Sequence, residues 1–387
     1  LPVKAGSHNL NLTKDGYRSW QKTLPVVRTE VSWIQYPFLV PLAIDTQSLG
    51  EVDQVSNWAQ SQDGKLLAMV SSGPPPAMRL LEVGKQELKA VYQPSPEEQA
   101  QGVQIGTVTW SLDSEHLLLE VKLAGQSHWF VINALNPSEI IDLSKEFGAS
   151  LSNLQFSAKN WRELYWLSPE GLRKLDIGSK TISAVLAANV NNFVVSEEAI
   201  FYVQTDAGAK QVVRLDRDNQ TKILVANLAA NDYGLVYIAY GDQHYVAVLD
   251  YASKSVSLYD SASESQKSLG RFDTVNATGM FMSPQDRFLI MQQDNQFAVY
   301  DFEFSKLYRF SLSAKPAAIS WFDEFHMLAT IDSQSLLLEF DGGNQEKLIE
   351  GISPQPVFAS RNRELVYSFT PSSTAGKVTL QASRLKR

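Results

Sequence analysis

The chain has 387 residues, of which 44% are hydrophobic and 20% are charged, and it contains no cysteine. This length is enough for one large or two ordinary domains, and the composition excludes a disordered chain. The absence of cysteine excludes disulfides, thiolate metal ligands and a cysteine nucleophile. The net charge is -8, and basic residues gather at 1–28 and 384–387, so the body between them is strongly acidic. We therefore expect no nucleic-acid partner.

The N-terminal residues have the pattern of a β-hairpin. Residues 6–17 end in the turn Asp15-Gly16-Tyr17, and residues 23–27 alternate apolar and polar side chains. These residues resemble the closing hairpin of a PEGA domain, a small β-sandwich module. The resemblance implies a bacterial extracytoplasmic or cell-surface protein. We expect 1–27 to be a truncated PEGA-like hairpin, tethered through a missing N-terminal segment.

Residues 28–45 form an apolar segment in which Pro37 and Pro41 exclude a helix. The repeat that follows ends in a unit with only three strands, so one strand is missing there. We expect part of 28–45 to supply it as the outer strand of the last repeat unit. Proline lacks a backbone N–H, and an edge strand does not need this donor at every residue. No apolar run approaches 18 residues, so a membrane is expected only through an anchor absent from this chain.

The rest of the chain is a repeat of about 40 to 45 residues, each copy reading as four short strands with polar turns. No helical periodicity is present, so we expect no helix. Aspartates close the third strand of several copies and are interpreted as turn caps. The first two strands of the eight copies lie at 57–69, 108–119, 154–167, 193–203, 236–248, 280–291, 318–330 and 356–369.

Four strands per unit at this period predict an all-β propeller, with eight blades expected and seven as the alternative. A lone blade cannot bury both of its faces, so neighbouring blades must stack. The segments 61–68 and 283–290 resemble the strand-turn-strand motif of WD40-like propellers of the TolB type. That resemblance implies a fold and no activity. We expect the propeller to span 28–387 and the chain to be a monomer.

A search for chemistry is negative throughout. The five histidines form no zinc-binding spacing, and neither a nucleophile elbow nor a phosphate-binding glycine loop occurs. We expect no catalytic residues, no metal site and no cofactor. Trp58, Trp110 and Trp321 occupy the same place in three copies. Packing between blades is one interpretation, and an aromatic ring that stacks on sugars is the other.

Loop length gives the positional hypothesis. Long loops are expected at 71–77, 93–104, 122–128 and 370–377, all on one face and in the first, second and last blades. Such loops are where propellers usually bind, although blades near a ring closure also tolerate insertions. The candidate binding residues are Pro74, Pro75, Pro76, Tyr92, Glu97 and Glu98.

Three functions stay open. The preferred one is a non-enzymatic, surface-tethered binding or scaffolding module that recognises a protein or a glycan through the loop-rich rim. A carbohydrate hydrolase or lyase is the second, and it requires two carboxylates about 5 to 10 Å apart in a pocket, one with a raised pKa. A structural spacer without a pocket is the third.

Overall fold

A computed structural model describes the protein in residues 3–28, 34–148, 150–262, 268–273 and 276–385. These form two compact units, each described by itself: 1–52 with 283–290 and 294–387, and 53–282 with 291–293.

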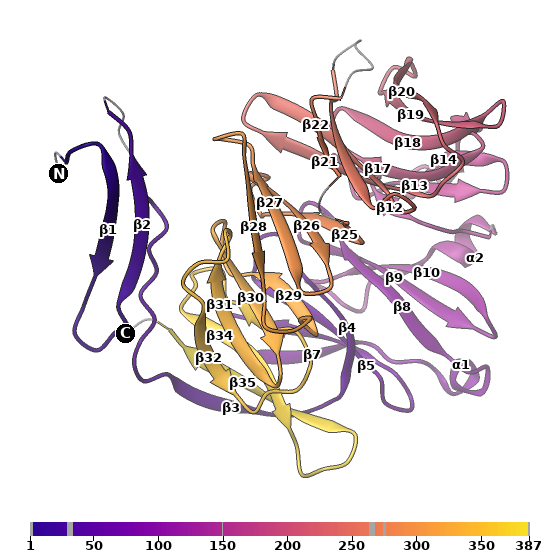
Figure 1. The fold of residues 1–387 in the computed structure, drawn as a ribbon. Coiled ribbons are helices and arrows are strands. Elements are labelled where there is room, and N and C mark those ends of the chain that lie inside the picture. Colours follow the sequence, from indigo (N-terminus) through magenta and orange to yellow (C-terminus); the bar gives the residue numbers. More distant parts are fainter. Residues whose placement is uncertain (1–2, 29–33, 149, 263–267, 274–275, 386–387) are drawn as a thin grey trace. The chain divides into compact units, whose positions relative to one another are not determined.

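The chain is an eight-bladed propeller of four-stranded antiparallel sheets, as the repeat predicted (Figure 1). Blades are numbered along the chain. Blade 1 contains β4 (Val55–Gln60), β5 (Leu66–Ser71), β6 (Met78–Glu82) and β7 (Glu87–Tyr92), and blade 2 contains β8 (Gln104–Trp110), β9 (His116–Leu123), β10 (Gln126–Asn133) and β11 (Ile140–Asp142). Blade 3 contains β12 (Gln155–Phe156), β13 (Glu163–Ser168), β14 (Gly171–Asp176), β15 (Thr181–Ile182) and β16 (Ala187–Ala188). Blade 4 contains β17 (Val190–Val195), β18 (Ala199–Asp206), β19 (Ala209–Asp216) and β20 (Thr221–Leu228). Blade 5 contains β21 (Tyr233–Tyr240), β22 (Gln243–Asp250), β23 (Ser255–Asp260) and β24 (Gly270–Phe272), and blade 6 contains β25 (Gly279–Met282), β26 (Phe288–Gln293), β27 (Gln296–Asp301) and β28 (Lys306–Ser311). Blade 7 contains β29 (Ala318–Trp321), β30 (His326–Ile331), β31 (Gln334–Glu339) and β32 (Glu346–Glu350). Blade 8 contains β33 (Phe358–Ala359), β34 (Leu365–Pro371), β35 (Lys377–Arg384) and β3 (Asp45–Asp53).

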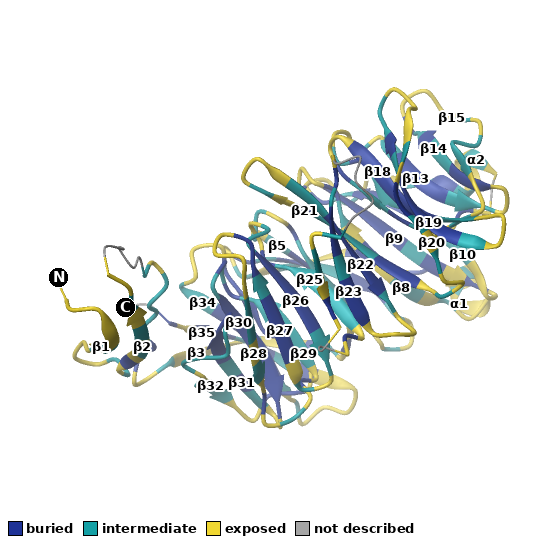
Figure 2. Ribbon diagram, turned by 45° about the horizontal axis from the view of Figure 1, so that its top comes forward, coloured by how far each residue is buried: buried dark blue, intermediate teal, exposed yellow. Residues whose placement is uncertain are grey.

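The core lies between the faces of successive blades. The second strands are the most apolar, and β30 is buried along its whole length (Figure 2). Leu117 and Leu119 of blade 2 pack in one cluster with Met78 and Leu80 of blade 1. Each blade therefore needs its neighbour to remove its apolar face from water.

The closing strand of the last blade lies further along the chain than expected. The prediction placed it within 28–45, but the structure forms it from β3, which pairs with β35. The strand is polar and largely exposed, as an outer edge strand can be, so its sequence carries no apolar signal. In the described part of 28–45, Phe38 and Val40 instead pack into the core of blades 7 and 8.

The N-terminal hairpin forms from β1 (Gly6–Leu12) and β2 (Trp20–Val26), which pair only with each other in the described structure. Its side chains reach blade 7. The Nε1–H of Trp20 donates to Oε1 of Glu339 over 2.6 Å, and the Lys22 ammonium pairs with Glu339 and, over 2.7 Å, with Asp341. The hairpin is thereby held to the propeller by a buried charge cluster.

Two expectations on local structure are wrong. The described residues include two one-turn helices, α1 (Pro96–Ala100) and α2 (Leu143–Phe147), which are too short to show periodicity. Ser95 and Glu98 form a capping box at the start of α1. The long loop expected at 122–128 is only the two-residue turn Ala124-Gly125 between β9 and β10. None of the helices in the described residues is long or apolar enough to cross a membrane.

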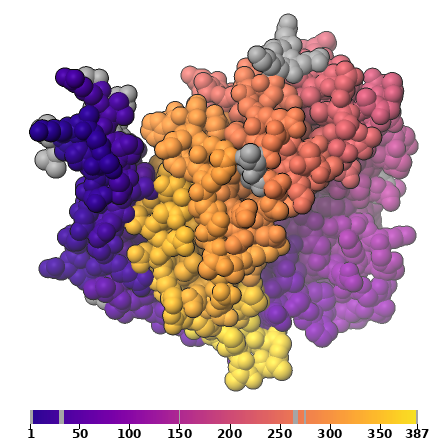
Figure 3. All heavy atoms as spheres, in the orientation of Figure 1, coloured from indigo at the N-terminus to yellow at the C-terminus, as the bar shows by residue number. Residues whose placement is uncertain are grey.

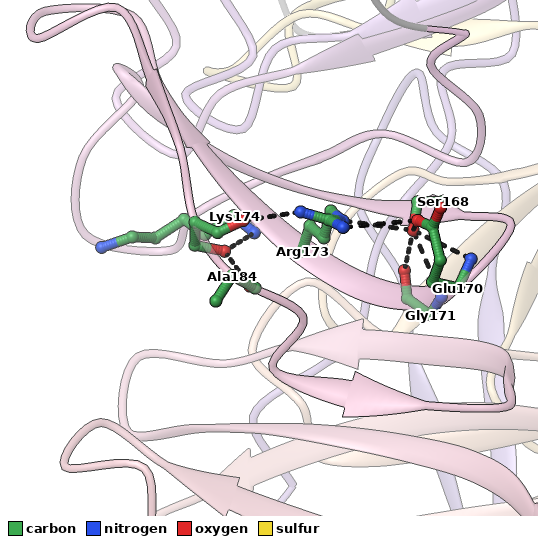
Figure 4. Close-up of polar contacts among 7 residues, drawn as sticks. Ser168, Glu170, Gly171, Arg173, Lys174 and Ala184 are labelled. Atoms are coloured by element: carbon green, nitrogen blue, oxygen red, sulfur yellow. Dashed lines mark hydrogen bonds and ion pairs between the residues drawn. The ribbon is translucent and has the colours of Figure 1, made fainter.

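The fourth strand of blade 3 is split into β15 and β16, which both pair with β14. Between them Ser183 bonds with the backbone of Lys174 and Ala184, and its carbonyl accepts from Arg173 over 2.9 Å (Figure 4). Gly171 faces β16 with φ of 141°, where an added Cβ would lie 2.0 Å from the Ala187 carbonyl oxygen. Only glycine fits this position.

Candidate functional site

The predicted loop residues divide into exposed and engaged ones. Pro74 and Pro75 are exposed on the connection between β5 and β6, and Pro76 is half-buried. The turn between β34 and β35 projects from the surface (Figure 3, yellow). That the long loops share one binding rim stays a prediction.

Tyr92 and Glu98 are occupied by each other. The Tyr92 hydroxyl donates to the Glu98 carboxylate over 3.0 Å, while the other Glu98 oxygen accepts the Ser95 N–H over 2.6 Å. The Tyr92 ring is buried against Phe130. Burial, with the Glu98 carboxylate second, raises the pKa of Tyr92 above its usual value. These two side chains therefore hold α1 in place, and Glu97 beside them is exposed.

The structure instead brings other residues together, in a cavity of about 640 Å³ along the first strands of blades 2 and 3. We call it the blade 2–3 cavity. None of the six predicted binding residues lines it, but Trp110 does. The lining consists of Gln62, Thr107, Thr109, Trp110, Leu112, Glu120, Ser127, Trp129, Ser152, Asn153, Leu154, Gln155, Phe156, Ser157, Ala158, Asn192 and Val195.

Two half-buried aromatic rings line this cavity. Trp110 ends β8 and packs on the core of blades 1 and 2, with its Nε1–H donating to the Ala59 carbonyl over 2.9 Å. Phe156 ends β12 and packs on the core of blades 2 and 3. In the described part of the chain, neither ring contacts another aromatic ring or a cation. The part of each ring that the core leaves uncovered is thus available to a ligand.

Three neutral polar side chains line the same cavity without a protein partner. Gln62, Thr109 and Asn153 are exposed and make no side-chain hydrogen bond to any residue that the structure describes. A hydroxyl and two amides can each donate and accept. A ligand with hydroxyl or amide groups can replace the water on them without stranding a buried partner.

Among the described residues, Glu120 is the one carboxylate that lines the cavity. Its oxygens accept from the Ser127 hydroxyl over 2.6 Å and from the Thr107 hydroxyl over 3.2 Å. Gly106 leaves room for this group, because an added Cβ would lie 2.5 Å from a Glu120 oxygen. These contacts hold the carboxylate in place, and no second carboxylate from the described part of the chain lines the cavity.

The carboxylate whose pKa is raised lies elsewhere. Glu324, in the turn between β29 and β30, is buried and accepts from the Ser283 hydroxyl over 2.5 Å and the Gln285 N–H over 2.7 Å. Burial raises its pKa. Three hydrogen bonds to its two oxygens, including one from the Arg287 N–H at 3.3 Å, connect the turn after β25 with the turn after β29, so this carboxylate has a structural role.

One group of side chains has the composition of a metal site. Asp113, Glu115 and His116 place their ligating atoms within 4.8 Å of one another. However, Asp113 already caps its own turn through the Glu115 N–H at 2.9 Å, and the His116 ring stacks on Trp161 at 3.7 Å. Burial lowers the pKa of His116, although Asp113 opposes this effect. The turn itself accounts for the cluster.

Apart from Trp110, the residues of the cavity escaped sequence reasoning. The usable signal was the run Thr107-Val108-Thr109, in which the buried valine separates two exposed threonines on a first strand. This alternation places the threonines on the face opposite to the core. Asn153 and Phe156 come from the next blade, and no local pattern connects them to β8.

No family model matches the chain, and no curated protein matches it. The resemblance of residues 1–27 to a PEGA domain therefore stays a prediction. Among solved structures, the chain is similar to the C-terminal WD40 domain of Sif2, with a TM-score of 0.58, 10% identity, and coverage of 87% of this chain and 98% of that one.

A prolyl endopeptidase matches with a TM-score of 0.57 and 13% identity over 83% of this chain and 55% of that chain. The dihydro-heme d1 dehydrogenase NirN matches with a TM-score of 0.54 and 12% identity over 76% of this chain and 66% of that chain. At these identities the likeness concerns the fold alone. It supports a WD40-like β-propeller, a fold that suits binding or scaffolding and also carries enzymes.

Proposed function

We propose that this protein is a non-enzymatic binding module whose ligand, polar and uncharged, occupies the blade 2–3 cavity. One observation carries the proposal: Trp110, Phe156, Thr109 and Asn153 line one cavity with ring surface and polar groups that no described residue uses. Pockets that combine aromatic surface with a few unpaired polar groups are the usual form of ligand sites.

The alternatives receive less support. A hydrolase or lyase of the two-carboxylate type needs a second acid, and Glu120 has none beside it in this cavity. A spacer has no need of a cavity of about 640 Å³ with uncovered rings. The loop-rich rim remains the rival location, with Pro74 and Pro75 exposed on it.

The location and partners are part of the proposal. The PEGA-like residues 1–27 support an extracytoplasmic, surface-tethered protein, and the chain is proposed to act as a monomer. Fractionation of cells and the mass of the protein in solution test these two points. A cytoplasmic pool or a stable oligomer would contradict them.

The binding experiment blocks the cavity without touching the core. Thr109 is exposed, so Thr109→Arg fills the cavity while the fold is kept. Thermal unfolding is followed with neutral oligosaccharides and with neutral acetylated peptides, because a ligand that prefers the folded state raises the midpoint. The shift seen with the unsubstituted protein should disappear in Thr109→Arg.

The matched control is Pro75→Ala on the rim, which should bind as the unsubstituted protein does. If Pro75→Ala, or deletion of 72–76, removes the shift while Thr109→Arg keeps it, the ligand binds at the rim and the proposed site is wrong.

A further inference from the structure

A second cavity adjoins the blade 2–3 cavity. Leu112, Ser157 and Ala158 line the blade 2–3 cavity and also line this second cavity of about 240 Å³. We call this second one the Lys159 cavity. Because the two share these three residues, they adjoin at the turn after β8 and the turn after β12, and we refer to them together as one groove.

Leu112 lies where the two cavities join. It is 44% exposed although it is a leucine, and it sits in the turn between β8 and β9. Together with Trp110 and Phe156 it gives the groove an apolar surface at three points along its length. The polar groups of Gln62, Thr109 and Asn153 lie in the same groove.

The Lys159 cavity adds a cation without an acidic partner. The Lys159 side chain is exposed and pairs with no carboxylate that the structure describes. Trp161 forms a firm wall there, because its ring stacks on His116 and lies 4.5 Å from the Arg162 guanidinium carbon. The Lys159 ammonium, which lines the same cavity, can donate up to three hydrogen bonds to hydroxyl or carbonyl oxygens.

We infer that the ligand is a linear oligosaccharide, which occupies the blade 2–3 cavity first and reaches the Lys159 cavity with its further residues. Sugar rings have apolar faces that fit Trp110, Phe156 and Leu112, and hydroxyls that both donate and accept, as Thr109 and Asn153 do. A chain of such units matches a groove that combines apolar surface and neutral polar groups with the charged side chains of Glu120, Asp113 and Lys159. This inference rests on the proposed function and adds the ligand class and its length.

Isothermal titration with neutral oligosaccharides of glucose and of N-acetylglucosamine, from one to six residues long, tests the inference. Affinity should rise at least about tenfold from the disaccharide to the longest member that still gains contacts. Lys159→Ala should remove this gain and leave disaccharide binding unchanged, whereas Leu112→Asp, where the two cavities join, should weaken binding at every length. Thr109→Arg should abolish binding at every length.

Matched controls lie on blade 2, outside the groove. Leu135→Asp and Lys122→Ala change an exposed leucine and an exposed lysine that line neither cavity, and both should bind as the unsubstituted protein does. Far-ultraviolet circular dichroism and the unfolding midpoint verify that every variant is folded.

The outcomes separate this inference from the proposed function. Affinity independent of length, full length dependence in Lys159→Ala, or unchanged binding in Leu112→Asp overturns the two-cavity groove. Binding of the neutral peptides and of no oligosaccharide, sensitive to Thr109→Arg, overturns the ligand class while the proposed function stands. Binding that Thr109→Arg leaves intact overturns both.

Discussion

Two regions of the molecule use polar side chains in opposite ways. Where the N-terminal hairpin meets blade 7, Lys22, Glu339 and Asp341 are charged, largely buried and paired with one another. In the blade 2–3 cavity, Thr109 and Asn153 are neutral, exposed and unpaired among the described residues. The charged groups of the first arrangement bond to one another, whereas the hydroxyl and amide groups of the second are open to a ligand.

The aromatic side chains repeat the contrast. Phe288, Phe325 and Phe340 of blades 6 and 7 pack on one another, and Tyr36 from the N-terminal segment stacks on Phe325 at 5.4 Å. Trp110 and Phe156 have no such ring neighbours among the residues that the structure describes. Polar and aromatic side chains that contact one another therefore indicate a structural site. Polar and aromatic side chains with uncovered surface indicate the candidate binding site.

The largest expected effect is at the paired cluster. Burial acts to lower the pKa of Lys22, but Asp341 and Glu339 outweigh it and hold that pKa above its usual value. Lys22→Ala leaves the fully buried Glu339 without its cation and should lower the free energy of unfolding by about 3–5 kcal/mol. Chemical denaturation measures this, and faster proteolysis of β1 and β2 should accompany it.

The control for that change is Lys4→Ala, at an exposed lysine without an ion pair to any described residue, which should shift stability by less than about 0.5 kcal/mol. Equal effects of the two substitutions would show that the cluster does not hold the hairpin.

The split fourth strand of blade 3 depends on Gly171. In Gly171→Ala the new Cβ collides with the Ala187 carbonyl, and the positive φ adds strain, so we expect a loss of about 3 kcal/mol. Gly208→Ala has a φ of 85° but nothing within 4 Å, so it should lose only about 1 kcal/mol. If both lose the same amount in denaturant titrations, backbone strain alone governs Gly171.

A pH titration probes a paired carboxylate in blade 7. Burial acts to raise the pKa of Asp323, but His326 and two backbone N–H groups at 2.8 Å outweigh it and lower that pKa. This stabilisation is present above the unfolded-state pKa of about 4 and is lost as the pH falls through the lower folded-state pKa. Asp323→Asn should be less stable by about 1.5–3 kcal/mol at pH 7.

The difference between Asp323→Asn and the unsubstituted protein should shrink as the pH is lowered towards 3 in a series of urea titrations. A difference that stays constant over that range would mean that the charge of Asp323 does not matter.

A smaller effect is expected at the predicted rim. Tyr92→Phe removes one hydrogen bond to Glu98 and should lower stability by about 1 kcal/mol. Glu97→Gln beside it should change the unfolding free energy by less than about 0.5 kcal/mol. Loss of ligand binding in Tyr92→Phe at unchanged stability would make Tyr92 a binding residue after all.

The smallest effect is predicted for the cavity itself. Thr109→Val changes an exposed side chain without a hydrogen-bond partner among the described residues, so stability should stay within about 0.5 kcal/mol. A clear loss of stability, measured by thermal or urea unfolding, would show that Thr109 is structural and would remove the contrast between the two regions.

The sequence by itself determined the class of fold and favoured eight blades over seven. The repeat period, the polar turns and the apolar second strands are local properties, and stacking of such units leaves few alternatives. The three strands left for the last blade also showed that the N-terminal segment must complete it.

Tertiary structure alone decided which segment completes that blade and which residues share a cavity. β3 is polar because it is an exposed edge, so hydrophobicity pointed to 28–45 instead. Thr109 and Phe156 come from different blades and meet only because β8 and β12 lie in neighbouring sheets. A sequence records the period of each strand, whereas contacts between blades depend on how the sheets stack.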